Sequence, residues 1–282
     1  MNDTDDWYYT EPVSGAIDAV SQTIARAESR AFVVEGTAET VLVDTGRGIG
    51  DLRAYLGEGG IDPDRVLLTH SHWDHVGNAH QFGDVAINDA ERNPDGSLTL
   101  DVVSEVFLQR PRQFIDNHLA AGRELPDSVD PEIFDIPAID HVDAHTPGDV
   151  IDLGDRHLEA VDLAGHTGGQ TGFLSRADRV LLGADLVHID RNVYAHFDDS
   201  SVDDYIASLE RAIDLRDAGA YDVLATAHNE PMSGDDLDLL DDLLAGLESI
   251  RDGAEPNARV ETKWGPAKEY EFGDTLVRVA AD

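Results

Sequence analysis

The sequence contains no cysteine among its 282 residues. This absence excludes disulfide scaffolds, thiol catalysis, iron–sulfur clusters and zinc sites built on thiolates. Any metal ion must therefore be held by histidine and carboxylate side chains. The chain also lacks a run of roughly 18 uncharged apolar residues, which is the length that a membrane span needs. The start, from Met1 to Asp6, is polar and acidic, unlike a signal peptide, so we expect a cytoplasmic location and no membrane partner.

Basic residues are scarce, because 20 Lys+Arg stand against 58 Asp+Glu and give a formal net charge of −38. Only two of the basic residues are lysines, Lys263 and Lys268. The acidic residues are spread along the chain, and such a surface suits a protein that works in molar salt, where self-repulsion is screened. We interpret this as adaptation to a halophilic cytoplasm, with an ordinary acidic protein as the alternative. The lack of basic surface argues against a nucleic-acid partner.

Apolar residues make up 41% of the chain and occur in short blocks that alternate with amphipathic stretches. This alternation predicts an α/β fold. The length fits one large domain, residues 1–282. The stretch from about 93 to 146 differs from the rest, because it combines a long amphipathic helix candidate with several prolines. We expect it to be an inserted helical and loop segment, of the kind that covers active sites.

The periodicity predicts the following elements. Strands are expected at residues 32–35, 41–44, 65–69, 85–88, 150–153, 157–163, 172–175, 180–183, 222–227 and 271–279. Helices are expected at residues 50–56, 74–81, 98–121, 202–215 and 235–250, whereas residues 14–30 fit either a helix or a hairpin.

The most informative stretch is THSHWDHVGN, residues 69–78, which follows an expected strand and opens an expected helix. His70 and His72 are two residues apart in an extended turn, so their side chains can point the same way. Asp74 and His75 begin the helix and are aimed elsewhere, so one loop can supply ligands to two adjacent ions. Imidazole and carboxylate ligands suit zinc, iron or manganese. The alternative is a solvated, histidine-rich turn.

Further candidate ligands follow other expected strands. His166 lies in AGHTGG after the strand that ends at residue 163, Asp185 follows the strand 180–183, and His228 closes the strand 222–227. All three come at carboxyl ends of strands, as do Asp44 and His70. That shared edge is where α/β sheets build their sites.

The order His-x-His-x-Asp-His, then His, Asp and His, resembles the metallo-β-lactamase-fold hydrolase superfamily from about residue 32 to residue 228. The resemblance implies a four-layer αββα sandwich with a binuclear metal centre between two sheets. It assigns two sets of ligands and a bridge: His70, His72 and His166 for the first ion, Asp74, His75 and His228 for the second, and Asp185 between them. Asp44, in VDTG, would orient a ligand histidine through a hydrogen bond.

The resemblance implies hydrolysis by a metal-bound hydroxide, with zinc as the first choice of metal and iron or manganese as alternatives. Asp74 and Asp185 would be the catalytic carboxylates, and Asp74 would steer the nucleophile and later take the proton. A small carbonyl substrate is expected, namely a thioester, a lactone or a related ester. The alternatives are a phosphodiesterase or nuclease and a mononuclear iron persulfide dioxygenase. A homo-oligomer stays open.

Four further residues are candidates for a substrate pocket. His188 follows Asp185 by three residues, and Tyr194 and His196 come shortly after it. A phenol near the metals would stabilise an oxyanion, although a surface loop that packs on the insertion is the favoured interpretation of this segment. Trp73 either lines the pocket or wedges the ligand loop into the core.

Overall fold

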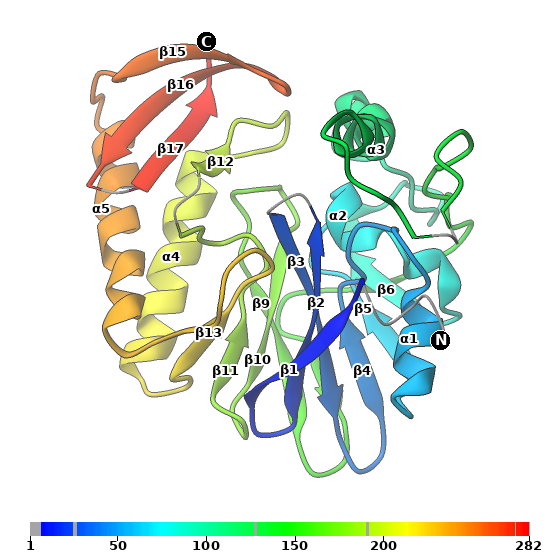
Figure 1. Ribbon diagram of the computed structural model, residues 1–282. Helices are drawn as coiled ribbons and strands as arrows, with labels where there is room; N and C mark the ends of the chain where they lie inside the picture. Colours follow the sequence, from blue (N-terminus) through cyan, green and yellow to red (C-terminus); the bar gives the residue numbers. More distant parts are fainter. Residues whose placement is uncertain (1–6, 25–26, 127–128, 190–191, 274, 282) are drawn as a thin grey trace. The chain divides into compact units, whose positions relative to one another are not determined.

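The computed structural model describes residues 7–24, 27–126, 129–189, 192–273 and 275–281 (Figure 1). The chain divides into two compact units. Unit 1 contains the residues up to 146 together with Asp152–Arg156, and unit 2 contains Pro147–Ile151 together with residues 157–282. Both units combine sheets with helices, so the expected α/β class is confirmed. No helix among the described residues has the length and hydropathy to cross a bilayer.

Unit 1 is built on one mixed sheet in which the strands follow one another in chain order from β1 to β7. The first four strands are antiparallel, and β4 to β7 run parallel, so the carboxyl ends of these last strands lie at one edge. The strands are β1 (Tyr9–Ser14), β2 (Ile17–Ile24), β3 (Ala27–Glu35), β4 (Thr40–Val43), β5 (Arg65–Leu67), β6 (Val85–Asn88) and β7 (Asp143–His145).

The ambiguous segment 14–30 falls within the hairpins formed by β1, β2 and β3. Cross-strand pairing along the length of β2 outweighs the helical spacing of its apolar residues. The helices of unit 1 are α1 (Leu52–Glu58), α2 (Trp73–Val76) and α3 (Arg110–Ala120). The expected helix 98–121 is wrong in its first part, because residues 98–104 are irregular and a short 3₁₀ turn precedes α3. Leu98 instead pairs with Ile139 in an antiparallel bridge.

Unit 2 contains a six-stranded and a four-stranded sheet, with orders β14-β13-β11-β10-β9-β8 and β12-β17-β16-β15. The six-stranded sheet consists of β8 (Val150–Asp152), β9 (His157–Asp162), β10 (Thr171–Ser175), β11 (Val180–Leu182), β13 (Val223–Ala225) and β14 (Met232–Ser233). The four-stranded sheet consists of β12 (Asn192–Ala195), β15 (Ala258–Thr262), β16 (Gly265–Phe272) and β17 (Thr275–Ala280). Two helices, α4 (Val202–Asp217) and α5 (Leu239–Arg251), complete the unit.

One apolar core joins both helices and both sheets of unit 2. Leucines of α5 are buried in it, with Leu240 and Leu247 fully inaccessible to solvent. Burial of each such side chain stabilises the fold by roughly 2 kcal/mol. Tyr270 and Val277 bring the four-stranded sheet to the same core. The two helices therefore fix the position of both sheets within this unit.

The interpretation of Tyr194 and its neighbours as a surface loop is wrong. Tyr194 lies in β12, which pairs in parallel with β17 so that Tyr194 is opposite Arg278. The strand is short, and its partner comes about eighty residues later in the chain. A pattern of local residues therefore gives no signal of this pairing.

Candidate metal centre

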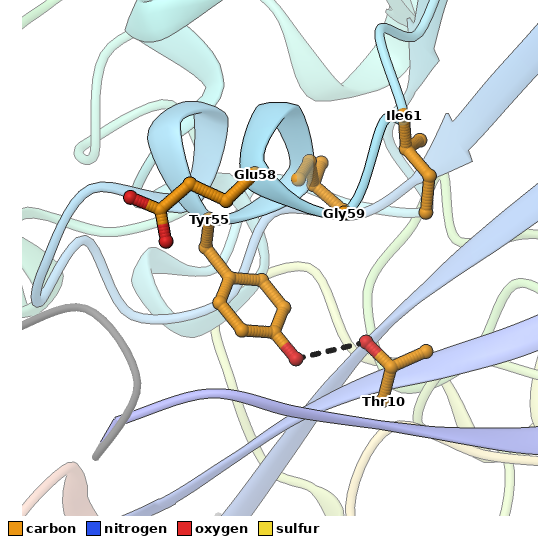
Figure 2. A pocket seen from close by; sticks show the side chains of 6 residues that line it. Thr10, Tyr55, Glu58, Gly59 and Ile61 are labelled. Atoms are coloured by element: carbon orange, nitrogen blue, oxygen red, sulfur yellow. Dashed lines mark hydrogen bonds between the residues drawn. The ribbon is translucent and has the colours of Figure 1, made fainter. Parts of the chain in front are cut away.

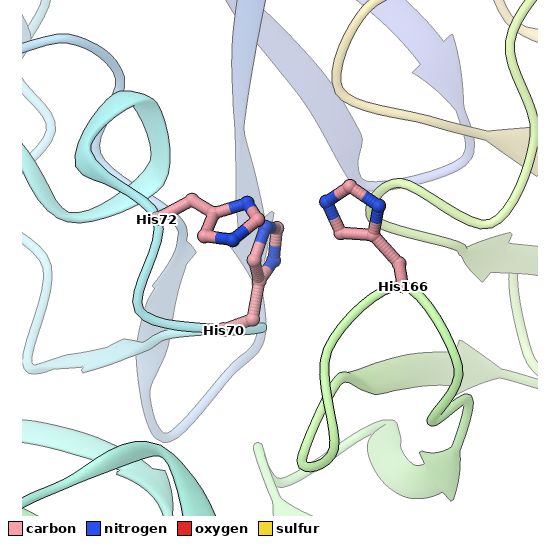
Figure 3. A group of neighbouring side chains, drawn as sticks. All are labelled: His70, His72 and His166. Carbon is pink, nitrogen blue, oxygen red and sulfur yellow. The ribbon is translucent and has the colours of Figure 1, made fainter. Parts of the chain in front are cut away.

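The histidine-rich loop of unit 1 runs from the end of β5 into α2. His70, His72 and His75 are all buried, and none is more than 4% exposed. The ring centroid of His70 lies 4.6 Å from that of His72 and 4.0 Å from that of His75. Figure 3 shows the rings of His70 and His72 side by side on this loop. Potential ligand atoms of Asp74 and His75 also lie within 4.8 Å of each other, so four ligand-type side chains gather in one loop.

Asp44 follows β4 and holds this loop from one side. Its carboxylate accepts hydrogen bonds from the backbone N–H of Thr69 at 2.9 Å, from the Thr69 hydroxyl at 2.9 Å and from Nδ1 of His75 at 2.8 Å. A proton held on Nδ1 leaves Nε2 of His75 as the nitrogen available to a metal ion. Asp44 has a φ of 60°, a backbone strain of the kind that collects at functional sites.

Glu91 holds the same loop from another side. Its side chain is fully buried, and Oε2 accepts hydrogen bonds from the backbone N–H of Ser71 at 3.0 Å and from the Ser71 hydroxyl at 2.7 Å. Ser71 stands between the two histidines of the motif. Hydrogen bonds to a buried charged acceptor are worth about 1.5–3 kcal/mol each, so Glu91 restricts the backbone that carries His70 and His72.

Gly77 sets how closely α2 approaches the turn after β4. A Cβ atom at this position would lie 2.1 Å from the backbone nitrogen of Gly48 and 2.6 Å from the carbonyl oxygen of Gly46. The backbone N–H of Gly77 donates a hydrogen bond to that Gly46 carbonyl at 2.9 Å. Only glycine fits here, and the close contact fixes the end of the helix that contributes Asp74 and His75.

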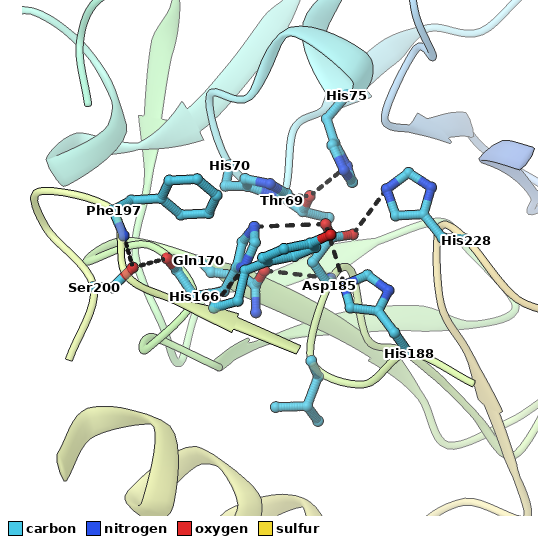
Figure 4. Close-up of polar contacts among 12 residues, drawn as sticks. Thr69, His70, His75, His166, Gln170, Asp185, His188, Phe197, Ser200 and His228 are labelled. Carbon is cyan, nitrogen blue, oxygen red and sulfur yellow. Dashed lines mark hydrogen bonds and ion pairs between the residues drawn. The ribbon is translucent and has the colours of Figure 1, made fainter. Parts of the chain in front are cut away.

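Unit 2 contributes a second cluster, centred on Asp185 (Figure 4). Nε2 of His166 lies 3.5 Å from Oδ2 of Asp185, and Nε2 of His228 lies 3.4 Å from Oδ1. His188 is also near, with Nε2 at 3.8 Å from Oδ2. Asp185 follows Ala184, a non-glycine residue with a φ of 50°. One nearly buried carboxylate is therefore surrounded by three imidazoles within the same unit.

Neutral groups hold the backbone around Asp185. The backbone N–H of Asp185 donates to Oε1 of Gln170 at 3.3 Å. The Tyr205 hydroxyl lies 2.6 Å from the Leu186 carbonyl oxygen and 3.0 Å from that of Asp185. Burial, and secondarily the charge of Asp185, raise the pKa of Tyr205 well above its usual value, so this phenol stays a neutral hydrogen-bond donor.

His166 is oriented by main-chain contacts. Its Nδ1 lies 2.9 Å from the carbonyl oxygen of Tyr194, to which it donates, and this leaves Nε2 toward Asp185. Gly165 allows the loop to lie against α4, because a Cβ at that position would come 2.4 Å from the Cα of Tyr205. The hydroxyl of Ser200 donates to the carbonyl of His166 at 2.7 Å.

The candidate pocket residues fall into two groups. Trp73 is 5% exposed, and its ring lies 5.4 Å from that of Phe114, so it wedges α2 into the interior of unit 1. Tyr194 and His196 belong to an aromatic group in unit 2, in which Trp264 lies 4.9 Å from Tyr194 and 6.0 Å from His196. Burial, with smaller contributions from the charges of Arg278 and His166, lowers the pKa of His196 to about 4. His196 is therefore neutral at physiological pH.

The donor set of both clusters fits divalent transition metals. Neutral imidazoles and carboxylates are the ligands that such ions take in the absence of thiolates. His75 and His166 each have Nδ1 engaged by an oxygen acceptor, as metal-bound histidines characteristically do. Each unit thus presents a buried set of ligand-type side chains in an orientation suited to a metal ion.

Two cavities of unit 1 involve none of these predicted ligands. One has a volume of about 350 Å³ and lies beside α1, where the hydroxyls of Thr10 and Tyr55 are 3.0 Å apart (Figure 2). The other has a volume of about 370 Å³ and is lined by Gly48, His80 and Phe134 among others. His80 lies at this second cavity.

Asp44 was predicted from the sequence, but sequence reasoning missed the other residues that position the predicted ligands. Glu91 is one of 58 acidic residues and carries no distinguishing neighbour in the sequence. Gln170 and Tyr205 likewise act through single contacts to backbone atoms. Only Thr69, which directly precedes His70, could have been found from its position.

Comparison with known proteins gives a consistent result. The profile of the metallo-beta-lactamase superfamily matches residues 27–219, which is more than half of the chain. The acyl-coenzyme A thioesterase MBLAC2 of Homo sapiens is 26% identical over 241 residues, covering 79% of this chain and 81% of that protein. The protein of the same name from Gallus gallus is 27% identical over 240 residues, with the same coverage.

Solved structures share the fold. A metallo-beta-lactamase family protein from Thermus thermophilus has a TM-score of 0.58 and 21% identity, covering 84% of this chain and 81% of that one. A metallo-beta-lactamase from Pontibacter korlensis has a TM-score of 0.57 and 16% identity, covering 86% of this chain and 99% of that one.

Proposed function

Because the chain belongs to the metallo-β-lactamase superfamily, we propose that it is a metal-dependent hydrolase of thioesters. The observation that carries the proposal is the similarity to acyl-coenzyme A thioesterases, which extends over 79% of this chain and 81% of theirs. The α/β fold of this superfamily and the histidine and aspartate clusters support divalent metal ions as cofactors. Acyl-coenzyme A is the first substrate to test, and lactones and simple esters follow.

We propose the ligand assignment and the single domain, residues 1–282, that the sequence predicts. His70, His72 and His166 would hold one ion, Asp74, His75 and His228 the other, and Asp185 would bridge them. The superfamily profile supports this, because it runs across the boundary between the units without a break, from residue 27 to residue 219. Zinc is the first choice of metal, with iron or manganese accepted by the same donors.

Bound divalent cations would lower the pKa of a water molecule and polarise the thioester carbonyl. Groups of this chain orient the side chains that we propose as metal ligands. Asp44 fixes the imidazole of His75, and the carbonyl of Tyr194 fixes that of His166. Asp74 is partly exposed at the start of α2, so its carboxylate can accept the proton of the attacking water. The water oxygen bonds to the carbonyl carbon, the C–S bond breaks, and the departing thiolate takes the proton from Asp74.

A substrate panel tests the proposal. Purified protein in molar salt is offered hexanoyl-coenzyme A, a lactone, a β-lactam, a bis-aryl phosphodiester and a glutathione persulfide. We expect the thioester to have the highest kcat/KM. The low number of basic residues disfavours the phosphodiester. A preference for the phosphodiester, or oxygen consumption with the persulfide, would replace thioester hydrolysis by one of the two alternatives.

We also propose that the protein works in molar salt. The net charge of −38 makes carboxylate repulsion large when counterions are removed, since the Debye length grows from about 3 Å at 1 M to about 30 Å at 0.01 M salt. Thioesterase activity and the far-ultraviolet circular dichroism spectrum should both be lost on dialysis into dilute buffer. Full activity in dilute buffer would contradict the proposal.

A further inference from the structure

We propose that the turn between β15 and β16, with Lys263 and Trp264 at its tip, binds the phosphate-bearing thiol carrier of the thioester. This inference rests on the proposed function and extends it to a part of unit 2 that contributes no metal ligand. The turn carries one of the only two lysines in a chain of net charge −38. A polyanionic substrate such as coenzyme A needs local positive charge to approach so acidic a protein.

A continuous series of aromatic contacts leads from the Asp185 cluster to this turn. The ring of Phe197 lies 5.2 Å from that of His166, edge to face. The same ring lies 5.8 Å from Trp264 at an interplanar angle of 90°. Tyr194, whose carbonyl fixes His166, lies 4.9 Å from Trp264. These side chains form an aromatic wall between His166 and the turn. In the proposal, the extended arm of the carrier lies along this wall with its thioester end at the proposed metal ligands.

The turn itself is firmly built. Thr262 and Gly265 pair across the hairpin, so Lys263 and Trp264 are its two central residues. The Thr262 hydroxyl donates to the carbonyl of Gly265 at 2.7 Å and accepts from the backbone N–H of Trp264 at 3.0 Å. The ammonium of Lys263 lies 4.3 Å from the centre of the Trp264 ring. The cation is thus held on an aromatic face, at the far end of the wall from His166.

His196 adds a hydrogen-bond acceptor within the wall. It is 6% exposed, and its Nε2 lies 3.4 Å from the Thr262 hydroxyl. Since that hydroxyl already donates to Gly265, Nε2 of His196 carries the proton and Nδ1 is an acceptor. Within the described part of the chain, Nδ1 of His196 has no hydrogen-bond partner. The pantetheine arm of coenzyme A carries amide N–H groups, which are suitable donors for such a nitrogen.

The other basic residues of the four-stranded sheet are placed differently. Arg278 lies opposite Tyr194, but its guanidinium is paired with Glu269 at 2.8 Å. Lys268 is opposite Arg259 and Val279, on the sheet face from which Tyr270 enters the core with α4 and α5. Tyr194 and Arg278 occupy the other face. Lys268 is therefore a matched control for Lys263, because it is a lysine of the same sheet directed away from the wall.

The experiment compares two substrates with the same acyl group. Hexanoyl-coenzyme A carries the phosphates, whereas the hexanoyl thioester of N-acetylcysteamine carries one amide and no phosphate. We expect Lys263→Glu to lower kcat/KM for the coenzyme A thioester about tenfold more than for the short thioester. Lys268→Glu should change this ratio less than twofold, and Lys263→Arg should restore it. An equal effect of Lys263→Glu on both substrates would overturn the inference.

Equilibrium binding of coenzyme A itself provides a readout apart from catalysis. Calorimetry should show a Kd that is about tenfold higher for Lys263→Glu and unchanged for Lys268→Glu. Displacement of coenzyme A by equimolar inorganic phosphate would reveal a simple anion site and overturn recognition of the carrier. If neither thioester is hydrolysed but Lys263→Glu still weakens coenzyme A binding, the proposed function fails and the binding site stands. If a thioester is hydrolysed but coenzyme A binding is unchanged in Lys263→Glu, the proposed function stands and the proposed binding site fails.

Discussion

The two units hold their ligand-type residues in different ways. In unit 1 all four lie within six positions of one loop, and the carboxylates of Asp44 and Glu91 fix that loop. In unit 2 they follow three separate strands, and the neutral groups Gln170, Tyr205 and the Tyr194 carbonyl hold them. A compact loop needs strong local support because it crowds several imidazoles. Dispersed ligands are positioned by the sheet itself and need only weak contacts.

The largest effect is expected where the unit 2 cluster is broken at its centre. Asp185→Asn keeps the size of the side chain but removes the charge that faces His166 and His228. Metal content in molar salt should fall from about two ions per chain to one or fewer, and kcat/KM should fall about a thousandfold. Plasma mass spectrometry and thioester hydrolysis measure the two quantities. Asp242→Asn, an exposed position of α5, serves as the control. Unchanged metal content in Asp185→Asn would contradict a bridging role.

This contrast explains what could be predicted from the sequence. The ligand loop of unit 1 is a local pattern, so His70 to His75 could be found without any knowledge of the sheet. The candidates in unit 2 could be found only because His166, Asp185 and His228 each follow an apolar strand. Glu91 and Gln170 could not be predicted, since their role is to contact a backbone group 15 to 20 residues away in the chain.

The parts of the fold that sequence reasoning missed also depend on contacts between residues far apart in the chain. The strand β12 exists because it pairs with β17, and no local periodicity records such a partner. The irregular residues 98–104 have helical spacing but are held by a bridge to Ile139. Local patterns sufficed for β6 and α4, where periodicity and burial agree.

The second prediction breaks the support of unit 1 at Asp44. Asp44→Asn keeps a residue that tolerates a positive φ but removes the charge beside His75. We expect metal affinity to fall by about 10- to 100-fold in chelator competition. Asp44→Ala should lose the hydrogen bonds of the side chain altogether and in addition cost about 1 kcal/mol of stability, because alanine is strained at this φ. Equal metal affinity in Asp44→Asn and the wild-type protein would show that the contact has no role in binding.

The third prediction concerns His196, a histidine of unit 2 that is neutral at physiological pH. His196 has a folded-state pKa of about 4, below the value of about 6.5 in an unfolded chain. The unfolded state therefore binds the proton first as pH falls, and stability is lost between about pH 6.5 and pH 4. Between pH 7.5 and pH 5 this loss is about 2 kcal/mol. Urea unfolding should show a correspondingly smaller loss for His196→Asn. His157→Asn, at an exposed position, should behave as the wild-type protein.

The smallest effect is expected when the support of unit 1 is made to resemble that of unit 2. Glu91→Gln replaces a charged acceptor of Ser71 by an amide, the type of group with which Gln170 holds Asp185. The hydrogen bonds are kept but weakened, so we expect a loss of about 1 kcal/mol and about fivefold in metal affinity. Thermal unfolding and chelator competition measure these changes, with the exposed Glu132→Gln as control. A loss as large as that of Asp44→Asn would mean that both carboxylates act as one support. No loss would mean that a neutral amide, such as the one by which Gln170 holds Asp185, supports the ligand loop of unit 1 as well as a carboxylate does.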